Sequence, residues 1–398
     1  MDLLRVLGIM LECGWFQSEQ IKHLQLTSLV VCEECRGTKR GFHVMVSDGT
    51  PRRLFEDRKR RQISTRSCIL SRVPPLRICE LTWDLRKLTL QGTCKRRIPF
   101  KLWPKDLHKL TFGHGFNQAV DGVILPTGLR QLAFGWRFNQ VLGRVIWPAT
   151  LQKLTFGRSF NQSVAGVVWP DGLLQLTFGE MFNREVAGVV WPTTLQKLKF
   201  GKCFNQPIEE VVWPIGLQQL TFGHDFNHAI DGVMWPAGLL QLTFGWCFNK
   251  KVEGVAWSAG LLQLTFGKSF NQAVGEVLWP AGLQKMIFGS NFDHAVDEVV
   301  WPEGLQFLTF GTCFNQHISG VIWPSGLRHL NFGTCFNKTI CSVVWPPGLQ
   351  FLTFGYFFNQ PVDTVIWPSS LKRVTFGYAF NQELTGIVWP AGLTLITF

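Results

Sequence analysis

The chain has 398 residues, is 46% hydrophobic and 17% charged, and carries a formal net charge of +12. The hydrophobic content is ample for a core, and no stretch approaches the roughly 18 consecutive apolar residues of a membrane-spanning helix. The N-terminus lacks the pattern of a secretory signal peptide. We therefore expect an intracellular protein with reduced thiols, in the cytoplasm or the nucleus.

The positive charge is concentrated at the N-terminal end. Residues 1–104 contain 20 Lys and Arg against 10 Asp and Glu, whereas residues 105–398 contain 19 against 17. We predict a basic leader over residues 1–84, partly helical or disordered. Its densest positive run comprises Arg52, Arg53, Arg58, Lys59, Arg60 and Arg61. Such a run is typical of a nuclear localisation signal or a phosphate-binding patch, and equally of a solvated loop.

One cysteine pair in the leader has half the spacing of a zinc site. Cys32 and Cys35 form a Cys-x-x-Cys motif, but no second pair matches it. The sequence therefore predicts no cofactor and no metal site, with Cys32 and Cys35 as the remaining candidate ligands. Further along, His224 and His228 have no carboxylate or nucleophile at a catalytic spacing, so we expect no enzyme activity.

From Leu107 to Phe398 the chain repeats itself at one fixed interval. Steps of 22 from Phe112 to Phe398 land on Phe fourteen times, and Gly follows the first thirteen. Phe also fills a second column from Phe116 to Phe380, and Trp fills most of a third. Such a period indicates a solenoid, because one unit is too small to bury its own apolar face and must stack on its neighbours.

Each repeat predicts one short strand. The pattern Leu-x-x-Leu-x-Phe, as in residues 107–112, places its second Leu and its Phe on one strand face. The following Gly turns the chain, and the Pro that recurs late in nearly every repeat, from Pro126 to Pro390, lies outside the strand ladder. We predict an all-β, leucine-rich-repeat-like solenoid over residues 85–398, with one parallel strand per coil and no substantial helices. Residues 85–106 form a degenerate capping coil and residues 107–398 the regular coils.

An asparagine column follows the second Phe of each repeat, from Asn117 to Asn381, with Asp293 as its one substitution. We expect these amides to be buried and to satisfy backbone groups of the stacked turns; the alternative is a row of exposed binding amides. Asp293 is expected to break this ladder, because an ionised carboxylate cannot donate a hydrogen bond. Coil 283–304 should then be a weak point.

The segment Phe-Asn-Gln occurs at residues 116–118, 138–140, 160–162 and 270–272, followed by a short apolar stretch and then Pro and Leu. This pattern resembles the FNIP repeat family, a leucine-rich-repeat-like group, although aliphatic residues are more usual there than the Trp before Pro. The resemblance implies a solenoid with an interaction role. Some members carry an F-box, which would imply a substrate adaptor of a ubiquitin ligase, but no F-box is apparent in this chain.

The outward strand positions differ between repeats, unlike the core columns. From Lys109 to Lys285 this column holds only Lys and Gln. It then continues with Phe307, His329, Phe351 and Arg373, and Tyr356, Phe357 and Tyr378 follow the last strands. Together these seven residues predict a partner-binding patch, because contiguous exposed apolar side chains mark protein contacts. The alternative is that some of the rings cover the end of the stack.

These features favour a non-enzymatic protein-interaction scaffold that binds an unidentified protein through its variable strand positions and adjacent loops, with no membrane partner. The alternative is a nucleic-acid-associated protein that binds through residues 36–97. The sequence stops at Phe398, at the end of a strand, which leaves an open sheet edge. We expect either a truncated sequence or an edge-to-edge dimer there.

Overall fold

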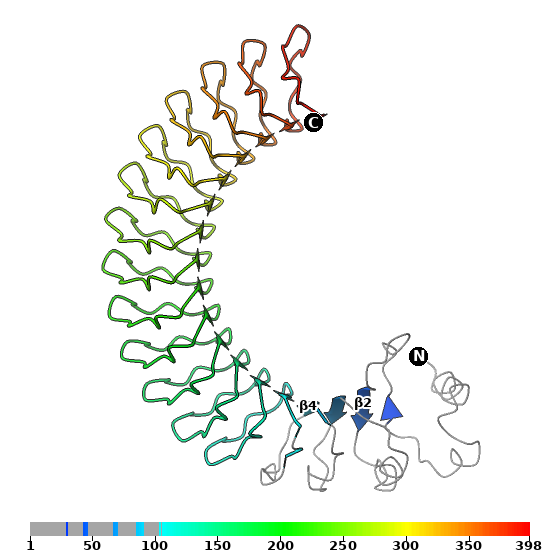
Figure 1. Cartoon of the computed structure of the whole chain (residues 1–398), viewed down its shortest axis with the longest axis vertical. Coiled ribbons are helices and arrows are strands. Elements are labelled where there is room, and N and C mark those ends of the chain that lie inside the picture. The colour runs from blue at the N-terminus through cyan, green and yellow to red at the C-terminus, as the bar shows by residue number, and fades with distance from the viewer. Residues whose placement is uncertain (1–28, 31–42, 47–66, 71–84, 91–102, 105) are drawn as a thin grey trace, which may run out of the picture. The chain divides into compact units, whose positions relative to one another are not determined.

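The computed structural model describes residues 29–30, 43–46, 67–70, 85–90, 103–104 and 106–398, and the chain divides into two compact units, Met1–Gly157 and Arg158–Phe398. The regular elements of the described residues are β-strands, one per coil (Figure 1). No described segment is a helix long and apolar enough to cross a bilayer. The predicted all-β solenoid with short parallel strands is confirmed.

The first unit contains a short sheet whose strands follow the order of the chain. Its strands are β1 (Leu29–Val30), β2 (His43–Val46), β3 (Ser67–Leu70), β4 (Lys87–Leu90), β5 (Lys109–Phe112), β6 (Gln131–Ala133) and β7 (Lys153–Thr155). β1 pairs antiparallel with β2, and each later pair up to β6–β7 is parallel. Parallel pairing thus begins at β2, within the predicted leader.

The early strands do not share the regular spacing of the later ones. His43 of β2 aligns with Ser67 of β3, and Ser67 aligns with Lys87 of β4, so the first step is longer than the regular period and the second is shorter. A search for one fixed period cannot detect coils of such unequal lengths. The boundary between leader and solenoid at residue 85 remains a prediction, since most of residues 1–84 lie outside the described residues.

The second unit is regular. Its strands are β8 (Gln175–Thr177), β9 (Lys197–Lys199), β10 (Gln219–Thr221), β11 (Gln241–Thr243), β12 (Gln263–Thr265), β13 (Lys285–Ile287), β14 (Phe307–Thr309), β15 (His329–Asn331), β16 (Phe351–Thr353), β17 (Arg373–Thr375) and β18 (Leu395–Thr397). Successive strands pair in parallel and align equivalent residues of successive repeats, as Leu220 with Leu242. The register of the sheet therefore equals the period of the sequence, and equivalent side chains lie in columns.

Three tight turns close each coil. In the coil that contains β10, the backbone N–H of Phe226 donates to the carbonyl of Gly223, that of Val233 to Ile230, and that of Leu239 to Pro236. All three bonds join residues three apart, which is the geometry of a β-turn. With a strand and three turns in every repeat, no length remains for a helix.

Stacked aromatic rings fill the core. Phe222 and Phe226 of one coil stack at 4.1 Å between ring centroids, and Phe222 stacks on Phe244 of the next coil at 5.7 Å. Trp235 lies edge-on against Phe222 and completes the core on the side away from the strand. The Phe and Trp columns are therefore structural, as the sequence predicts, and offset stacking adds to the stabilisation from burial.

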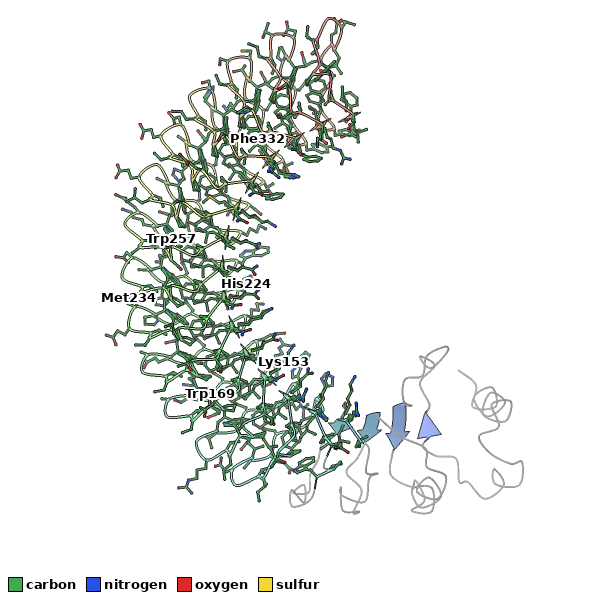
Figure 2. All side chains as sticks on the ribbon, in the orientation of Figure 1. Lys153, Trp169, His224, Met234, Trp257 and Phe332 are labelled. Carbon is green, nitrogen blue, oxygen red and sulfur yellow. The ribbon has the colours of Figure 1, made fainter. Side chains whose placement is uncertain are left out.

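Equivalent rings on the exposed face of the strands lie closer together than equivalent rings in the core. The spacing is 4.3 Å between Phe307 and His329 on the exposed strand face, but 6.4 Å between Trp213 and Trp235 at the back of the core. Because the back of each coil is thicker than its front, the stack in the second unit bends towards the strands, which line its inner side (Figure 1). Figure 2 shows Met234 on the outer side of this curve.

The glycine after each strand is required by close backbone packing. A Cβ atom added to Gly245 would lie 1.5 Å from the carbonyl oxygen of Gly223 in the preceding coil. No side chain fits there, because backbone atoms rather than a flexible side chain occupy the space. The same contact recurs along the stack, which explains why this column holds only Gly.

The asparagine column forms the predicted ladder of side-chain hydrogen bonds to backbone, but the expectation that its amides are buried is wrong, because they are half-buried or exposed. The Oδ1 atom of Asn249 accepts bonds from the backbone N–H of Asn271 at 2.8 Å and from Gln272 Nε2 at 3.0 Å. Asp293 was expected to break this ladder, and that expectation is wrong. Its Oδ1 accepts the N–H of Asn315 at 2.8 Å, and its own N–H donates to Asn271. The ladder needs an acceptor at this atom, and a carboxylate supplies one.

The close contact at Gly245 predicts that Gly245→Ala lowers the free energy of unfolding by about 3 kcal/mol, because the new methyl group forces two backbones apart. Chemical denaturation measures this change. The control is Gly232→Ala, whose Cβ would have its nearest neighbour at 3.9 Å and should change stability by less than about 1 kcal/mol. Equal losses of stability in the two variants would contradict the conclusion that close backbone packing requires Gly at position 245.

The asparagine ladder predicts different results for two substitutions of Asn249. Asn249→Ala removes the acceptor of a backbone N–H and should cost about 1–3 kcal/mol. Asn249→Asp keeps Oδ1, as Asp293 does, and should cost clearly less. Thermal unfolding of the two variants and the parent protein compares them. A loss in Asn249→Asp as large as that in Asn249→Ala would show that the amide nitrogen, rather than Oδ1, holds the turn.

Candidate functional site

The outward row of the strand face changes character along the second unit. From β8 to β13 its side chains are polar: Gln175, Lys197, Gln219, Gln241, Gln263 and Lys285. From β14 to β17 they are Phe307, His329, Phe351 and Arg373. Each is the first residue of its strand, and the buried Leu, Met or Val that follows fixes its outward direction. The fold therefore presents this row at the surface and leaves its chemistry free to vary.

Three rings of this row form a continuous stack. Phe307 and His329 lie 4.3 Å apart with an interplanar angle of 15°, and His329 and Phe351 lie 4.4 Å apart at 5°. Phe307 is 38% exposed. Parallel pairing of β14, β15 and β16 sets this spacing, because it places equivalent residues on adjacent strands side by side. Arg373 follows Phe351 in the row.

The environment of His329 favours its neutral form. Partial burial between two Phe rings, followed by the nearby charge of Arg328, lowers the pKa of His329 below its ordinary value. A neutral imidazole stacks on Phe without carrying a charge into an apolar contact. At neutral pH the stack of Phe307, His329 and Phe351 is thus an uncharged aromatic surface.

The other three predicted rings form a separate cluster on the loops that follow β16 and β17. Tyr356 contacts Phe357 edge-on at 5.0 Å and stacks on Tyr378 of the next coil at 5.1 Å. All three are exposed. The structure therefore groups the predicted patch into a strand-face cluster and a loop cluster. That either binds a partner remains a prediction.

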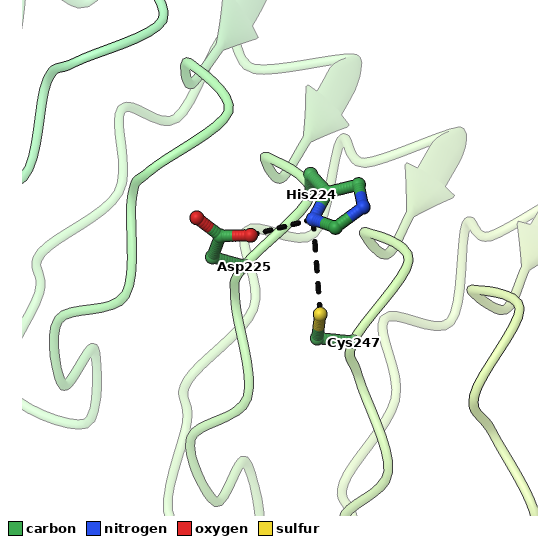
Figure 3. Close-up of side chains that lie close together, drawn as sticks. All are labelled: His224, Asp225 and Cys247. Carbon is green, nitrogen blue, oxygen red and sulfur yellow. Dashed lines mark hydrogen bonds and ion pairs between the residues drawn. The ribbon is translucent and has the colours of Figure 1, made fainter.

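Three potential metal ligands meet on the loops after β10 and β11 (Figure 3). Nδ1 of His224 lies 2.5 Å from Oδ1 of Asp225 and 3.7 Å from Sγ of Cys247. Burial, and then the charge of Asp225, raise the pKa of the Cys247 thiol. The expectation that His224 has no carboxylate or nucleophile beside it is wrong, because Asp225 is the next residue and Cys247 lies one coil further.

Sequence reasoning also missed a row of exposed aliphatic residues on the outer side of the second unit. Each residue of this row directly precedes the Trp of its repeat: Val168, Val190, Val212, Met234, Ala256, Leu278, Val300, Ile322, Val344, Ile366 and Val388. Those larger than Ala are 77–88% exposed. The signal in the sequence is alternation: in an extended segment, a residue between a buried Val and a buried Trp must point outwards.

The candidate sites predicted in the leader lie outside the described residues. They are the basic patch of Arg52, Arg53, Arg58, Lys59, Arg60 and Arg61, and the cysteine pair Cys32 and Cys35. Both remain predictions.

Comparison with known proteins supports the repeat assignment. The FNIP repeat family model matches residues 116–159, 204–247, 314–357 and 358–398. Among solved structures the chain is similar to CroV588, a novel circular LRR protein, with 31% identity and a TM-score of 0.65. That match covers 84% of this chain and 59% of CroV588, so the chain spans little more than half of its relative. An internalin, InlF, from Listeria monocytogenes matches at 10% identity over 74% of this chain and 80% of its own, with a TM-score of 0.44. No curated protein sequence matches the chain.

The stacked position of His329 predicts a titration below about pH 6.5, the ordinary value for histidine. The folded state then binds this proton less tightly than the unfolded state. His329 therefore adds stability above about pH 6.5, and this contribution is lost as the pH falls through the lower folded-state pKa. NMR titration, with His329→Phe to assign the signal, measures the pKa. A value at or above 6.5 would rule out the desolvated stack.

Proposed function

We propose that this chain, whose repeats match the FNIP repeat family model in four segments, is a non-enzymatic protein-interaction scaffold that acts in the cytoplasm or nucleus. Its leucine-rich-repeat-like solenoid is of a type generally used for protein interaction. Fixed columns of Phe, Trp and Gly build the core, so the outward strand positions can change without loss of the fold. The binding face in this proposal is the strand face from β14 to β17.

The observation that carries the proposal is the stack of Phe307, His329 and Phe351. It follows a row of polar Gln and Lys side chains and is not part of the core, since Phe307 remains 38% exposed. Aromatic residues at the surface are over-represented among the residues that contribute most to protein–protein binding. A rigid stack also loses little side-chain entropy on binding, because its rotamers are already held by the neighbouring rings.

The chemistry of this face indicates which kind of partner surface it would bind. The ring stack suits an apolar or aromatic segment that lies flat across β14 to β16. Arg373, next in the row, and Lys372 beside it add positive charge at one end. We therefore propose a protein partner that carries an apolar anchor with acidic residues on one side of it. The loop cluster of Tyr356, Phe357 and Tyr378 lies after the last of these strands and would extend the contact.

A second candidate function rests on charge alone. Residues 1–104 carry twice as many basic as acidic residues, and such an excess favours binding to nucleic-acid phosphates. Binding of this kind would weaken steeply as salt rises, because it releases counterions, and it would not depend on the strand face.

Affinity capture with full-length baits tests the proposal at physiological salt. We expect Phe307→Ser with Phe351→Ser to lose a protein partner that the parent bait retains, while far-UV circular dichroism stays unchanged. The matched control is Gln241→Ser with Gln263→Ser, which changes two exposed residues of the same row and should leave capture intact.

Two outcomes would contradict the strand-face proposal. One is that both double variants retain the same partners. The other is that captured proteins disappear on nuclease treatment of the parent bait, which would support the nucleic-acid alternative.

A further inference from the structure

His224, Asp225 and Cys247 come together because of the repeat. Asp225 and Cys247 occupy the same column in successive coils, and His224 precedes Asp225 on the loop after β10. Two backbone bonds hold the loops in place: the N–H of Cys247 donates to the carbonyl of His224 at 2.8 Å, and that of Asp225 donates to Lys202 at 2.9 Å. The backbone positions from which the three side chains extend are therefore fixed by hydrogen bonds between successive coils.

The fold does not require these three residues. In the column of His224, other coils carry residues as different as Glu180, Lys268 and Thr312. The side chains of His224 and Asp225 are 38% and 40% exposed, so neither fills the core. Stability is supplied by the neighbouring Gly223 and Phe226. Packing therefore does not explain why His224, Asp225 and Cys247 lie together.

The donor atoms match the ligands of a borderline-soft metal ion. One imidazole nitrogen, one carboxylate oxygen and one thiol sulfur all lie within 4.8 Å of one another. Ligand atoms around a tetrahedral zinc ion lie about 3.3–3.7 Å apart. The separation of 3.7 Å between His224 Nδ1 and Cys247 Sγ already fits. The hydrogen bond of 2.5 Å between His224 and Asp225 would open by about 1 Å as the ion replaces the shared proton.

The surroundings hold the imidazole ring and leave access for the ion. Trp246 stacks on His224 at 5.3 Å and 20°, and Lys268 Nζ lies 4.2 Å from the centre of the Trp246 ring. This stacking limits rotation of the His224 ring, as supporting residues do in metal sites. The exposed sides of His224 and Asp225 leave room for a fourth ligand from solvent.

We propose that His224, Asp225 and Cys247 form a binding site for one Zn²⁺ ion, with a water molecule as fourth ligand. The mixed nitrogen, oxygen and sulfur donors favour Zn²⁺ over Mg²⁺ or Ca²⁺, which take oxygen ligands. On binding, Zn²⁺ displaces the thiol proton of Cys247 to solvent and bonds to the resulting thiolate. The proton between His224 Nδ1 and Asp225 moves through solvent to Nε2, so that a neutral imidazole binds the ion through Nδ1. The ion then links the loops of two successive coils, those after β10 and β11.

Cobalt(II) is a suitable probe, because its thiolate complexes absorb in the near-ultraviolet and its tetrahedral complexes have intense visible bands. The parent for the experiment is the full chain with Cys32→Ser and Cys35→Ser, which removes the leader pair as a competing site. We expect one equivalent of Co²⁺ to produce both absorptions, and Zn²⁺ but not Mg²⁺ to displace it.

Variants then test the assigned ligands. Cys247→Ser should remove the charge-transfer band, and His224→Gln or Asp225→Asn should weaken binding at least about 10-fold. The matched control is Cys313→Ser, a free and exposed cysteine of the same column without the His–Asp pair, which should bind as the parent does. Absence of Co²⁺ binding to the parent would overturn the proposal. So would a spectrum that survives Cys247→Ser, or one that Cys313→Ser removes equally.

Discussion

Two different spacings act in every coil, and the structure depends on how they are combined. Hydrogen bonds hold neighbouring strands about 4.8 Å apart, whereas the Phe and Trp rings behind them stack at distances near 5.7 and 6.4 Å. A coil with both spacings is wedge-shaped, because it is thicker at the aromatic rings than at its strand. Identical wedges in the same register bend the second unit towards its strands, and this places the variable strand row on the inner side and the aliphatic row on the outer side (Figure 1).

Much of the fold could be predicted because identical side chains are stacked at one interval. When sheet register equals sequence period, a residue such as Leu220 must lie beside Leu242, and the repeat pattern alone predicts this contact. The parallel strands β2 and β3 were not predicted, because the unequal steps between β2, β3 and β4 leave no period to detect. Asp293 was misjudged because the sequence shows the residue type but not which of its atoms the neighbouring N–H uses.

The candidate sites were predictable only in part, for a related reason. Because Phe307, His329 and Phe351 occupy equivalent positions in successive repeats, the sequence predicts that they are neighbours. The structure adds that their rings stack. It also separates Tyr356, Phe357 and Tyr378 into a loop cluster. The meeting of His224 with Cys247 combines two adjacent columns, and a search for motifs along the chain does not compare positions that lie in different repeats. In a solenoid, comparing neighbouring columns across neighbouring coils is the more useful search.

The contact between Gly245 and Gly223 has a consequence for how such a chain can change length. Because the regular coils from Gly135 to Gly377 meet their neighbours through the same kind of backbone contact, a whole repeat can be gained or lost by duplication or deletion without creating a new kind of junction. A gain or loss of a single residue would instead shift Gly, Phe and Asn out of their columns. Evolution can therefore alter the distance between the His224 loop and the Phe307 stack in steps of one coil, which makes repeat number a means of matching the surface to partners of different size.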